Sequence, residues 1–244
     1  MQVKDCVALV TGANRGIGEQ FVRALRAAGA RRIYAAARDA GSLAVAAADR
    51  GAVVPIAIDV TREADIAGAA ARCNDVTLLV NNAGVNFNTP LVGIASLANA
   101  RAEIETNYFG TLAMCRAFAP VLKANGGGAI VNMLSILARV NLPLMGSLCA
   151  SKAAALSMTQ GVRAELKKQG TLVVAVMPGA VDTRMTAILP PPKMNPADVA
   201  KAALEAVEKG AEDVYPGEMA QGVAAGLAKD AKAVEAQFSA YLPG

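Results

Sequence analysis

Short apolar runs alternate with amphipathic helical patterns along nearly the whole chain of 244 residues. Most of these runs are continuously apolar, which is typical of strands that helices cover on both faces. The expected strands are residues 7–10, 32–36, 53–58, 77–80, 129–133, 172–177 and 213–215, and the expected helices are 17–28, 41–49, 62–73, 97–124, 146–168 and 196–208, with a helical tail at 218–240. The alternation predicts an α/β fold, a doubly wound (Rossmann) parallel sheet of about seven strands with helices on both faces.

The first strand runs directly into a glycine-rich turn, Thr11-Gly12-Ala13-Asn14-Arg15-Gly16-Ile17-Gly18, and a helical pattern follows at once. Glycine lets the backbone turn sharply and approach a ligand closely. The first N–H groups of a helix have no partner inside it, and the helix dipole favours a phosphate there. A strand, a glycine turn and a helix start in this order predict a nucleotide phosphate site.

Composition excludes several classes of function. Aromatic residues make up 4% of the chain, Trp is absent, and the net charge of +4 is scattered, so a nucleic-acid-binding face is not expected. No apolar run approaches the roughly 20 residues that span a membrane. Histidine is absent, which excludes Ser-His-Asp triads and His-based zinc sites, and we expect no metal. Four widely spaced cysteines and no visible signal peptide predict a cytoplasmic protein.

Chemistry-bearing residues follow the ends of the later strands, which meet at one edge of a parallel sheet. Asp59-Val60 follows the third strand, Asn81-Asn82-Ala83-Gly84 closes the fourth, and Ser135 follows the fifth. Two further segments are Ser151-Lys152-Ala153-Ala154, near the start of a long helix, and Pro178-Gly179-Ala180-Val181-Asp182-Thr183, after the sixth strand.

In the order and spacing of these motifs the chain resembles a short-chain dehydrogenase/reductase of the compact, single-domain type. The resemblance covers nearly the whole chain and implies one dinucleotide-binding domain, residues 1–244, with the substrate pocket in the loops at the carboxyl edge of the sheet. It also implies a homodimer or homotetramer, because in this family the helices that match 97–124 and 146–168 form an interface between subunits.

The resemblance assigns roles to single positions. Ser135 would hold the substrate oxygen, Lys152 the ribose hydroxyls of the nicotinamide half, and Asn107 a water of the proton relay. Asp59 would accept from the adenine amino group, with the Val60 backbone beside it. The expected coenzyme-binding residues are Gly12, Asn14, Arg15, Gly16, Ile17, Gly18, Arg38, Asp59, Val60, Asn81, Ala83, Gly84, Lys152, Pro178, Gly179, Val181 and Thr183.

The end of the second strand indicates which coenzyme is bound. NAD-binding chains place an acid there, to accept from the ribose 2′-hydroxyl. Here Ala37 stands at that position and Arg38 follows, and a guanidinium suits a 2′-phosphate. Arg15 can reach the same phosphate, whereas a shift of one residue would put Asp39 in the acid position. We therefore expect NADP(H), with NAD(H) as the alternative that Asp39 leaves open.

One position departs from the family pattern. The family's reductases carry a tyrosine four residues before the lysine and 13 residues after the serine, and it exchanges the proton at the substrate oxygen. Counting back from Lys152 and forward from Ser135 both lead to Leu148. The tyrosines of this chain, Tyr34, Tyr108, Tyr215 and Tyr241, lie elsewhere in the sequence.

Three explanations of Leu148 are open. The chain could be a natural or engineered reductase with weak carbonyl activity, since loss of a positioned acid costs about 10²–10⁴-fold. It could reduce an imine or iminium, whose reacting carbon needs no enzyme proton. It could also bind a nucleotide without redox chemistry. The expected pocket walls are mostly apolar and favour a largely apolar substrate. They are Val85, Asn86, Ile136, Leu142, Leu144, Met145 and Met185.

Overall fold

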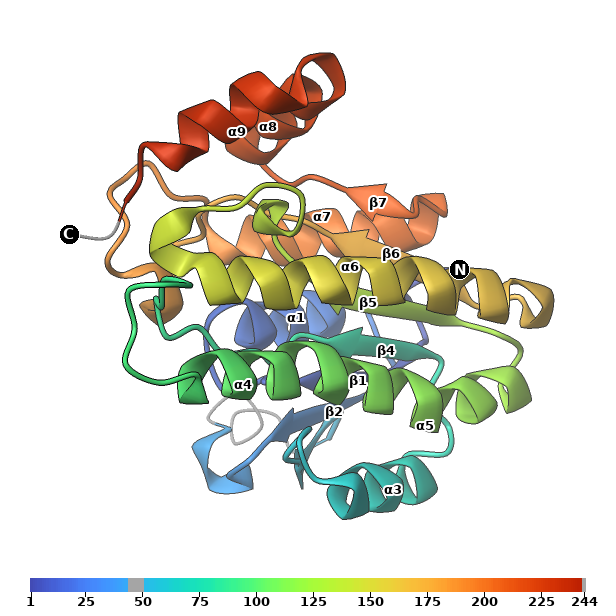
Figure 1. Cartoon of the computed structure of the whole chain (residues 1–244). Helices are drawn as coiled ribbons and strands as arrows, with labels where there is room; N and C mark the ends of the chain where they lie inside the picture. The colour runs from blue at the N-terminus through green and yellow to red at the C-terminus, as the bar shows by residue number, and fades with distance from the viewer. Residues whose placement is uncertain (44–50, 243–244) are drawn as a thin grey trace.

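The computed structural model describes residues 1–43 and 51–242, and its strands all run parallel in one sheet (Figure 1). Their side chains are buried almost throughout the central strands, because helices cover both faces. In these described ranges the sheet has seven strands: β1 (Val7–Thr11), β2 (Arg32–Ala37), β3 (Val53–Ala57), β4 (Leu78–Asn81), β5 (Ala129–Met133), β6 (Leu172–Val176) and β7 (Asp213–Val214). The predicted doubly wound α/β fold is confirmed.

The strand order is β3-β2-β1-β4-β5-β6-β7, so the direction of winding reverses between β1 and β4. At such a reversal the connections leave the strand ends in opposite directions and open a crevice at the carboxyl edge. The glycine turn follows β1 and the Asn-Asn-Ala-Gly segment follows β4. The fold therefore places these two motifs side by side at the crevice.

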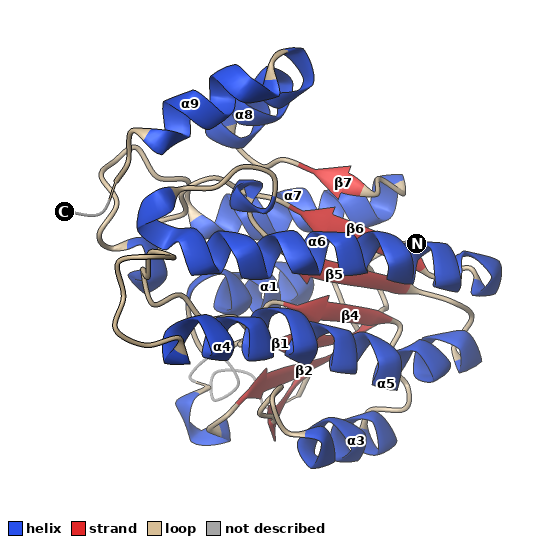
Figure 2. Cartoon of the chain, viewed as in Figure 1, coloured by secondary structure: helices blue, strands red, loops and turns tan. Residues whose placement is uncertain are grey.

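Two helical layers bury the sheet (Figure 2). The helices α1 (Gly16–Ala27) and α7 (Pro196–Lys209) pack together on one face. The other face carries α3 (Glu63–Arg72), α5 (Thr111–Ala124) and α6 (Gly146–Leu166). In α1 the buried residues Gly18, Phe21, Val22 and Leu25 recur at helical spacing, so one stripe of the helix faces the sheet.

The expected helix at 97–124 is interrupted where it passes the site. It consists of α4 (Ala98–Ile104), one π-helical segment η2 (Glu105–Gly110) and α5. A π turn inserts an extra residue into the helical ladder and is frequent at functional sites. Gly110 lies against Val60, where a Cβ would come within 2.8 Å of the valine Cγ2.

The remaining expectations agree with the structure apart from element ends. The tail contains α8 (Glu218–Lys229) and α9 (Ala231–Ser239), which lie beyond β7 in Figure 1. Of the helix expected at 41–49, residues 44–49 lie outside the described residues, and the turn η1 (Ala40–Ser42) precedes them. Short turns η3 (Ile136–Ala138), η4 (Pro143–Met145), η5 (Lys167–Gln169) and η6 (Arg184–Thr186) complete the chain. Within residues 1–43 and 51–242, none of the helices has the length and apolar character required to cross a membrane.

Candidate functional site

The turn after β1 leaves the start of α1 open to a ligand. Arg15 occupies the N-cap position in an extended conformation, and no side chain of the described residues caps this helix end. The first N–H groups of α1 therefore remain available to an anion, which the helix dipole also favours. The arrangement fits the pyrophosphate of a dinucleotide.

Gly12 and Gly18 allow the close backbone approach that this turn requires. Gly12 has a φ of +63°, a conformation that side chains other than glycine rarely adopt. A Cβ on Gly18 would lie 2.2 Å from the Gly12 carbonyl oxygen and 2.5 Å from Asn82 Nδ2. The Asn82 amide donates to the carbonyl oxygens of Thr11 and Gly12 at 2.9 and 3.2 Å. The ends of β1 and β4 are thus joined directly beneath the turn.

The end of β2 presents Arg38 rather than an acid to this edge. Asp39 Oδ1 accepts from the Gly41 N–H at 2.8 Å and thereby caps the turn η1. One oxygen of the Asp39 carboxylate is therefore engaged in its own turn. Asn14 Nδ2 donates to Ser42 Oγ at 3.3 Å, so the glycine turn and η1 border the same space.

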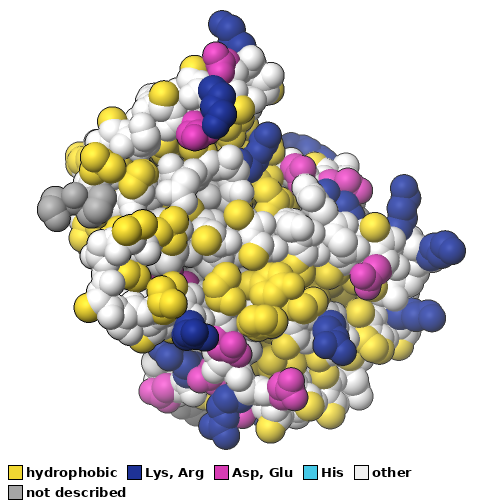
Figure 3. Space-filling model, viewed as in Figure 1, with side chains coloured by type: hydrophobic (Ala, Val, Ile, Leu, Met, Phe, Trp, Pro, Cys, Tyr) yellow, Lys and Arg dark blue, Asp and Glu magenta, His cyan; other side chains and the backbone are white. Residues whose placement is uncertain are grey.

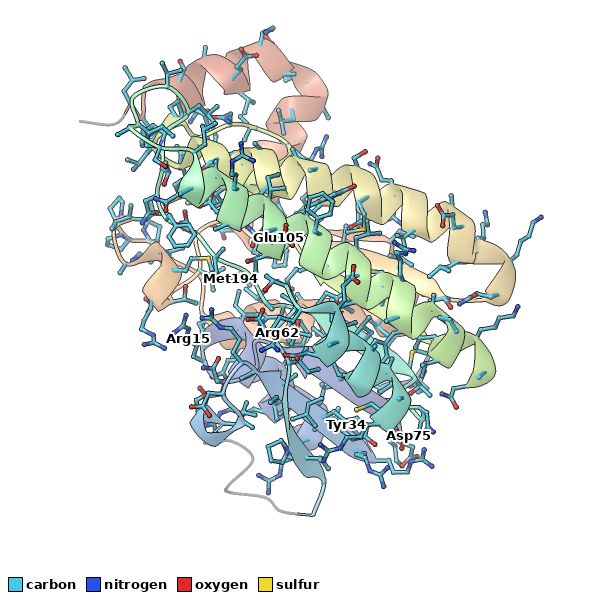
Figure 4. All side chains as sticks on the ribbon, turned by 60° about the horizontal axis from the view of Figure 1, so that its bottom comes forward. Arg15, Tyr34, Arg62, Asp75, Glu105 and Met194 are labelled. Carbon is cyan, nitrogen blue, oxygen red and sulfur yellow. The ribbon has the colours of Figure 1, made fainter. Side chains whose placement is uncertain are left out.

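Asp59 lies in a positively charged part of the crevice. Partial burial would raise the pKa of its carboxyl, but hydrogen bonds from the Thr61 hydroxyl and N–H outweigh this effect. The charges of Arg38 and Arg62 add to the lowering, and the pKa of Asp59 is below its ordinary value. Figure 4 shows Arg15 and Arg62 at the same end of the sheet, whereas Tyr34 and Asp75 lie together elsewhere.

Asn107 on η2 is buried and fixed by three hydrogen bonds. Its Nδ2 donates to the Val85 carbonyl at 3.0 Å and to Ser151 Oγ at 2.9 Å, while its Oδ1 accepts from the Val85 N–H at 2.9 Å. Ser151 Oγ in turn donates to the Leu148 carbonyl at 2.8 Å. The side chain of Asn107 therefore holds the segment after β4 against α6.

Lys152 points from α6 to the ends of β4 and β5. Its Nζ donates to the Met133 carbonyl oxygen at 2.7 Å, which is its only hydrogen bond among the described residues. A Cβ on Gly84 would lie 3.7 Å from Nζ and 3.1 Å from Asn107 Oδ1, so glycine leaves the space that these groups share. Burial lowers the pKa of the Lys152 amine from 10.5 to about 8.

Ser135 lies two residues beyond Met133, at the exit of β5. It is half-buried, and its Oγ accepts from the Leu137 N–H at 3.1 Å as the cap of η3. This bond uses one lone pair and leaves the hydroxyl hydrogen available to an oxygen of a substrate. Ser135 and Lys152 therefore converge on the end of the same strand.

Leu148 is 6% exposed and belongs to an apolar cluster. Its buried neighbours in the cluster are Leu142, Met145 and Cys149, and Leu189 and Phe238 pack against them. The cluster brings residues of the loop before α6, the loop after β6 and α9 to one side of the crevice. An aliphatic wall therefore stands where the resemblance implies a phenol.

The four tyrosines are engaged at other places. Tyr34 donates to Asp75, Tyr215 accepts from Arg139 at 2.8 Å, and Tyr108 packs edge-on against Phe109. Tyr241 is 58% exposed, and its carbonyl accepts from the Leu144 N–H at 3.2 Å. Among the described residues, none of these contacts places a phenol against Leu148 or Lys152.

The segment after β6 completes the crevice. The Pro178 carbonyl accepts from the Ile136 N–H at 2.9 Å, and Gly179 is covered by Met219 of α8. Val181 accepts a hydrogen bond from Thr186, and the Thr183 methyl lies 3.4 Å from a Cβ built on Gly16. The segment after β6 therefore lies close to the glycine turn at Gly16.

Several interactions escaped the sequence-based prediction. Ser147, in the first turn of α6, is buried and donates to the Thr89 carbonyl at 3.2 Å. The sequence analysis assigned no role to the side chains of Asn82, Ser151, Arg62 and Glu103. Of these, Asn82 carried a signal, because it adjoins Asn81 in the same motif; the others depend on contacts between elements distant in sequence. The Asn81 side chain is buried, and its Nδ2 donates to Asn132 Oδ1 at 2.9 Å.

Comparisons with known proteins agree with this geometry. Residues 6–193 match the family model described as short chain dehydrogenase. A sorbitol dehydrogenase of Cereibacter sphaeroides is 38% identical over 187 residues, which cover 75% of this chain and 73% of that protein. The crystal structure of a short chain dehydrogenase from Burkholderia cenocepacia in complex with NADP is 51% identical. It superposes with a TM-score of 0.93 and covers 98% of this chain and 99% of that one. A short-chain dehydrogenase from Sphingobium yanoikuyae in complex with NADPH is 27% identical, with a TM-score of 0.77 over 92% and 96% of the two chains.

Proposed function

Because the chain belongs to the short-chain dehydrogenase family of oxidoreductases, we propose that it transfers hydride between NADP(H) and a small, largely apolar carbonyl, alcohol or imine substrate. The observation that carries the proposal is the meeting of three groups at one crevice. These are the open start of α1, the Lys152 amine at the end of β5, and the Ser135 hydroxyl beside it.

The residues present fit the coenzyme. The glycine turn and the uncapped N-terminus of α1 would hold the pyrophosphate, and Lys152 and Asn107 border the place of the nicotinamide ribose. When bound, the nicotinamide supplies or accepts the hydride. The protein's own part is to hold the substrate oxygen at Ser135, to exclude water with the Leu148 cluster, and to supply or accept the proton at the substrate oxygen.

Arg38 supports NADP(H) over NAD(H). Its guanidinium is near enough to Asp59 to lower the pKa of that carboxyl, while Asp39 is committed to the cap of η1. A permanently charged, planar group at this point can hold a 2′-phosphate in two-pronged fashion. The NADP in the Burkholderia relative and the NADPH in the Sphingobium relative support the same choice.

The wall around Leu148 supports a largely apolar substrate. Leu142, Met145 and Leu148 form its buried part, and Leu144 and Leu189 extend it. Such a wall gives no partner to a hydroxylated chain, so a polyol would leave buried polar groups without hydrogen bonds.

A second candidate function is nucleotide binding without redox chemistry, which the loss of the family's phenol at Leu148 favours. The two candidates differ in one assay. Oxidation of NADPH is followed against a panel of ketones, enones and cyclic imines, after NADPH binding has been measured by fluorescence titration. Turnover with any class supports the oxidoreductase, and turnover of imines alone supports an imine reductase. Tight NADPH binding with no turnover on the whole panel refutes the oxidoreductase and leaves the binding protein.

The face formed by η2, α5 and α6 supports self-association. Figure 3 shows hydrophobic side chains gathered over this face, and Phe109 within it is 49% exposed. Exposed apolar patches of this kind mark protein interfaces. We expect a dimer or tetramer that buries this face, and a monomeric mass in analytical ultracentrifugation at micromolar concentration would contradict the expectation.

A further inference from the structure

Reduction of a carbonyl needs a proton as well as a hydride, and Leu148 cannot supply it. When hydride adds to the carbonyl carbon, the π electron pair moves to oxygen, which must then bind a proton. The Ser135 hydroxyl can hold this oxygen, but the serine must itself be reprotonated if it gives its proton away. The site therefore needs a titratable group within reach of Ser135.

The titratable groups nearest to Leu148 on the same helices do not fill this role. Cys149 Sγ is engaged with the Leu142 N–H at 3.3 Å, and burial raises the pKa of its thiol, with the charge of Glu103 adding to the rise. Glu103 on α4 is fully buried, and its Oε1 accepts from the Phe87 N–H at 2.8 Å. Both groups are buried and already accept a hydrogen bond from a backbone N–H.

Lys152 has the position and the free hydrogen atoms. One N–H of its ammonium is bonded to the Met133 carbonyl, and the remaining two have no partner among the described residues. Nζ also lies next to Gly84, where a Cβ would be 3.7 Å from it, so residue 84 puts no side chain in front of the amine. Met133 precedes Ser135 by two residues, which puts Lys152 and the substrate-holding hydroxyl at the same strand end.

We propose that Lys152 is the catalytic acid of this chain, giving the proton to the substrate oxygen held by Ser135, directly or across one water molecule. This inference rests on the proposed function. In reduction, an N–H bond of the ammonium breaks and an O–H bond forms on the product alcohol, while the coenzyme loses the hydride. The neutral amine then takes a proton from solvent. In alcohol oxidation the neutral amine accepts the proton instead.

The acidity of Lys152 suits this role. Burial is the only cause of the lowered pKa of about 8, and no charged group contributes. None of the charged or titratable groups on the elements packed around Lys152 is a cause of its lowered pKa. These groups are Arg101 and Glu103 on α4, Glu105 and Tyr108 on η2, Cys115, Arg116 and Lys123 on α5, Cys149, Arg163 and Glu165 on α6, and Arg139 after η3. An acid works best when its pKa is near the working pH, and a lysine at about 8 meets that condition.

The test combines two substitutions and one direct titration, with the full-length protein. Lys152→Arg keeps a cation and hydrogen-bond donors for the ribose but cannot release a proton near neutral pH. The Lys152→Arg substitution is made both in the native chain and in a Leu148→Tyr variant, in which a phenol can act as the acid.

Rates of ketone reduction are measured from pH 6 to 10, and NADPH affinity is measured for each protein. The pKa of Lys152 in the coenzyme-free protein is measured by ¹⁵N NMR of the labelled amine. Tyr241→Phe is the control variant, which tests whether the exposed Tyr241 phenol supplies the proton instead; the Tyr241 carbonyl is bonded to the Leu144 N–H.

The proposal expects kcat to fall above pH of about 8 in the native chain, in step with the NMR titration. It expects Lys152→Arg to cost about 10²-fold or more in kcat there, but much less in the Leu148→Tyr background. NADPH affinity should change only a few-fold, and Tyr241→Phe should have no effect. An equal loss in both backgrounds, an NMR pKa above 10, or a large loss in Tyr241→Phe would overturn the proposal.

Failure of the proposed function gives different results. If NADPH does not bind, the proposed function falls and this inference falls with it. If NADPH binds and the Leu148→Tyr variant turns over while the native chain does not, the crevice is competent but Lys152 is not an acid.

Discussion

The buried charge of Lys152 makes a prediction about stability that does not depend on any substrate. Burial lowers the pKa of the amine from 10.5 to about 8, so the folded protein loses this proton more readily than the unfolded chain does. Between these two values the unfolded chain binds more protons. The free energy of unfolding therefore rises with pH across this window, and the cost of the buried charge is fully present below pH 8.

The magnitude follows from the size of the window. A difference between 10.5 and about 8, at about 1.36 kcal/mol for each unit, corresponds to roughly 3 kcal/mol of destabilisation at pH 7. Lys152→Met removes the charge and keeps an unbranched side chain of similar length. It also removes the hydrogen bond to the Met133 carbonyl, which is worth about 1 kcal/mol. We expect Lys152→Met to stabilise the protein by about 2 kcal/mol at pH 7.

The advantage of Lys152→Met should disappear as the amine of the native chain becomes neutral in both states. At a pH of about 10.5 the variant should be the less stable protein, by about 1 kcal/mol for the lost hydrogen bond. Urea denaturation at pH 7 and at high pH gives the difference between the two proteins, in which the titration of all other groups cancels. Lys201→Met, at an exposed position on α7, is the control and should show no such trend. A difference between Lys152→Met and the native chain that stays constant with pH would refute the lowered pKa.

Three further predictions concern the coenzyme site and the missing phenol. Gly18→Ala should weaken NADPH binding at least 10-fold in fluorescence titration, because the new Cβ would lie 2.2 Å from the Gly12 carbonyl oxygen. Gly161→Ala on α6 is the control: its Cβ would meet no atom within 4 Å, so this variant should bind NADPH normally and have a slightly higher melting temperature. Arg38→Ala should raise the dissociation constant of NADPH about 10-fold or more and leave that of NADH nearly unchanged, whereas equal changes would contradict a 2′-phosphate contact. Leu148→Tyr should raise the rate of ketone reduction by about 10²-fold; a folded, NADPH-binding variant with no gain would show that the pocket has diverged as well.

The fold could be predicted from sequence because its signals are local. Continuous apolar runs gave six of the strand positions within a residue or two at their ends. The π turn η2 could not be predicted, because the apolar pattern of 97–124 continues across it. Within this segment Asn107 makes three hydrogen bonds to Val85 and Ser151, which are contacts between elements distant in sequence.

The coenzyme end of the site shows the same limit. From sequence, Arg38 and Asp39 were competing candidates for the end of β2, separated by one residue of alignment. The proposal of NADP(H) draws on the structure, in which Asp39 Oδ1 caps η1 while Arg38 lies near enough to Asp59 to affect its pKa. The choice depends on where a turn begins, which is a property of the backbone that composition does not encode.

The absence of a phenol at position 148 also affects the expected protonation of Lys152. Beside a tyrosine, a cationic lysine is stabilised whenever the phenol ionises, and the two groups titrate together. In this chain Leu148 precedes Lys152 by four residues on α6, and the amine has the Met133 carbonyl as its hydrogen-bond partner. No anion among the described residues compensates its burial, so the charge becomes easier to lose at the pH where the enzyme would work. Burial without a neighbouring anion therefore gives this chain, which has no phenol at position 148, an amine acidic enough for the proposed proton transfer.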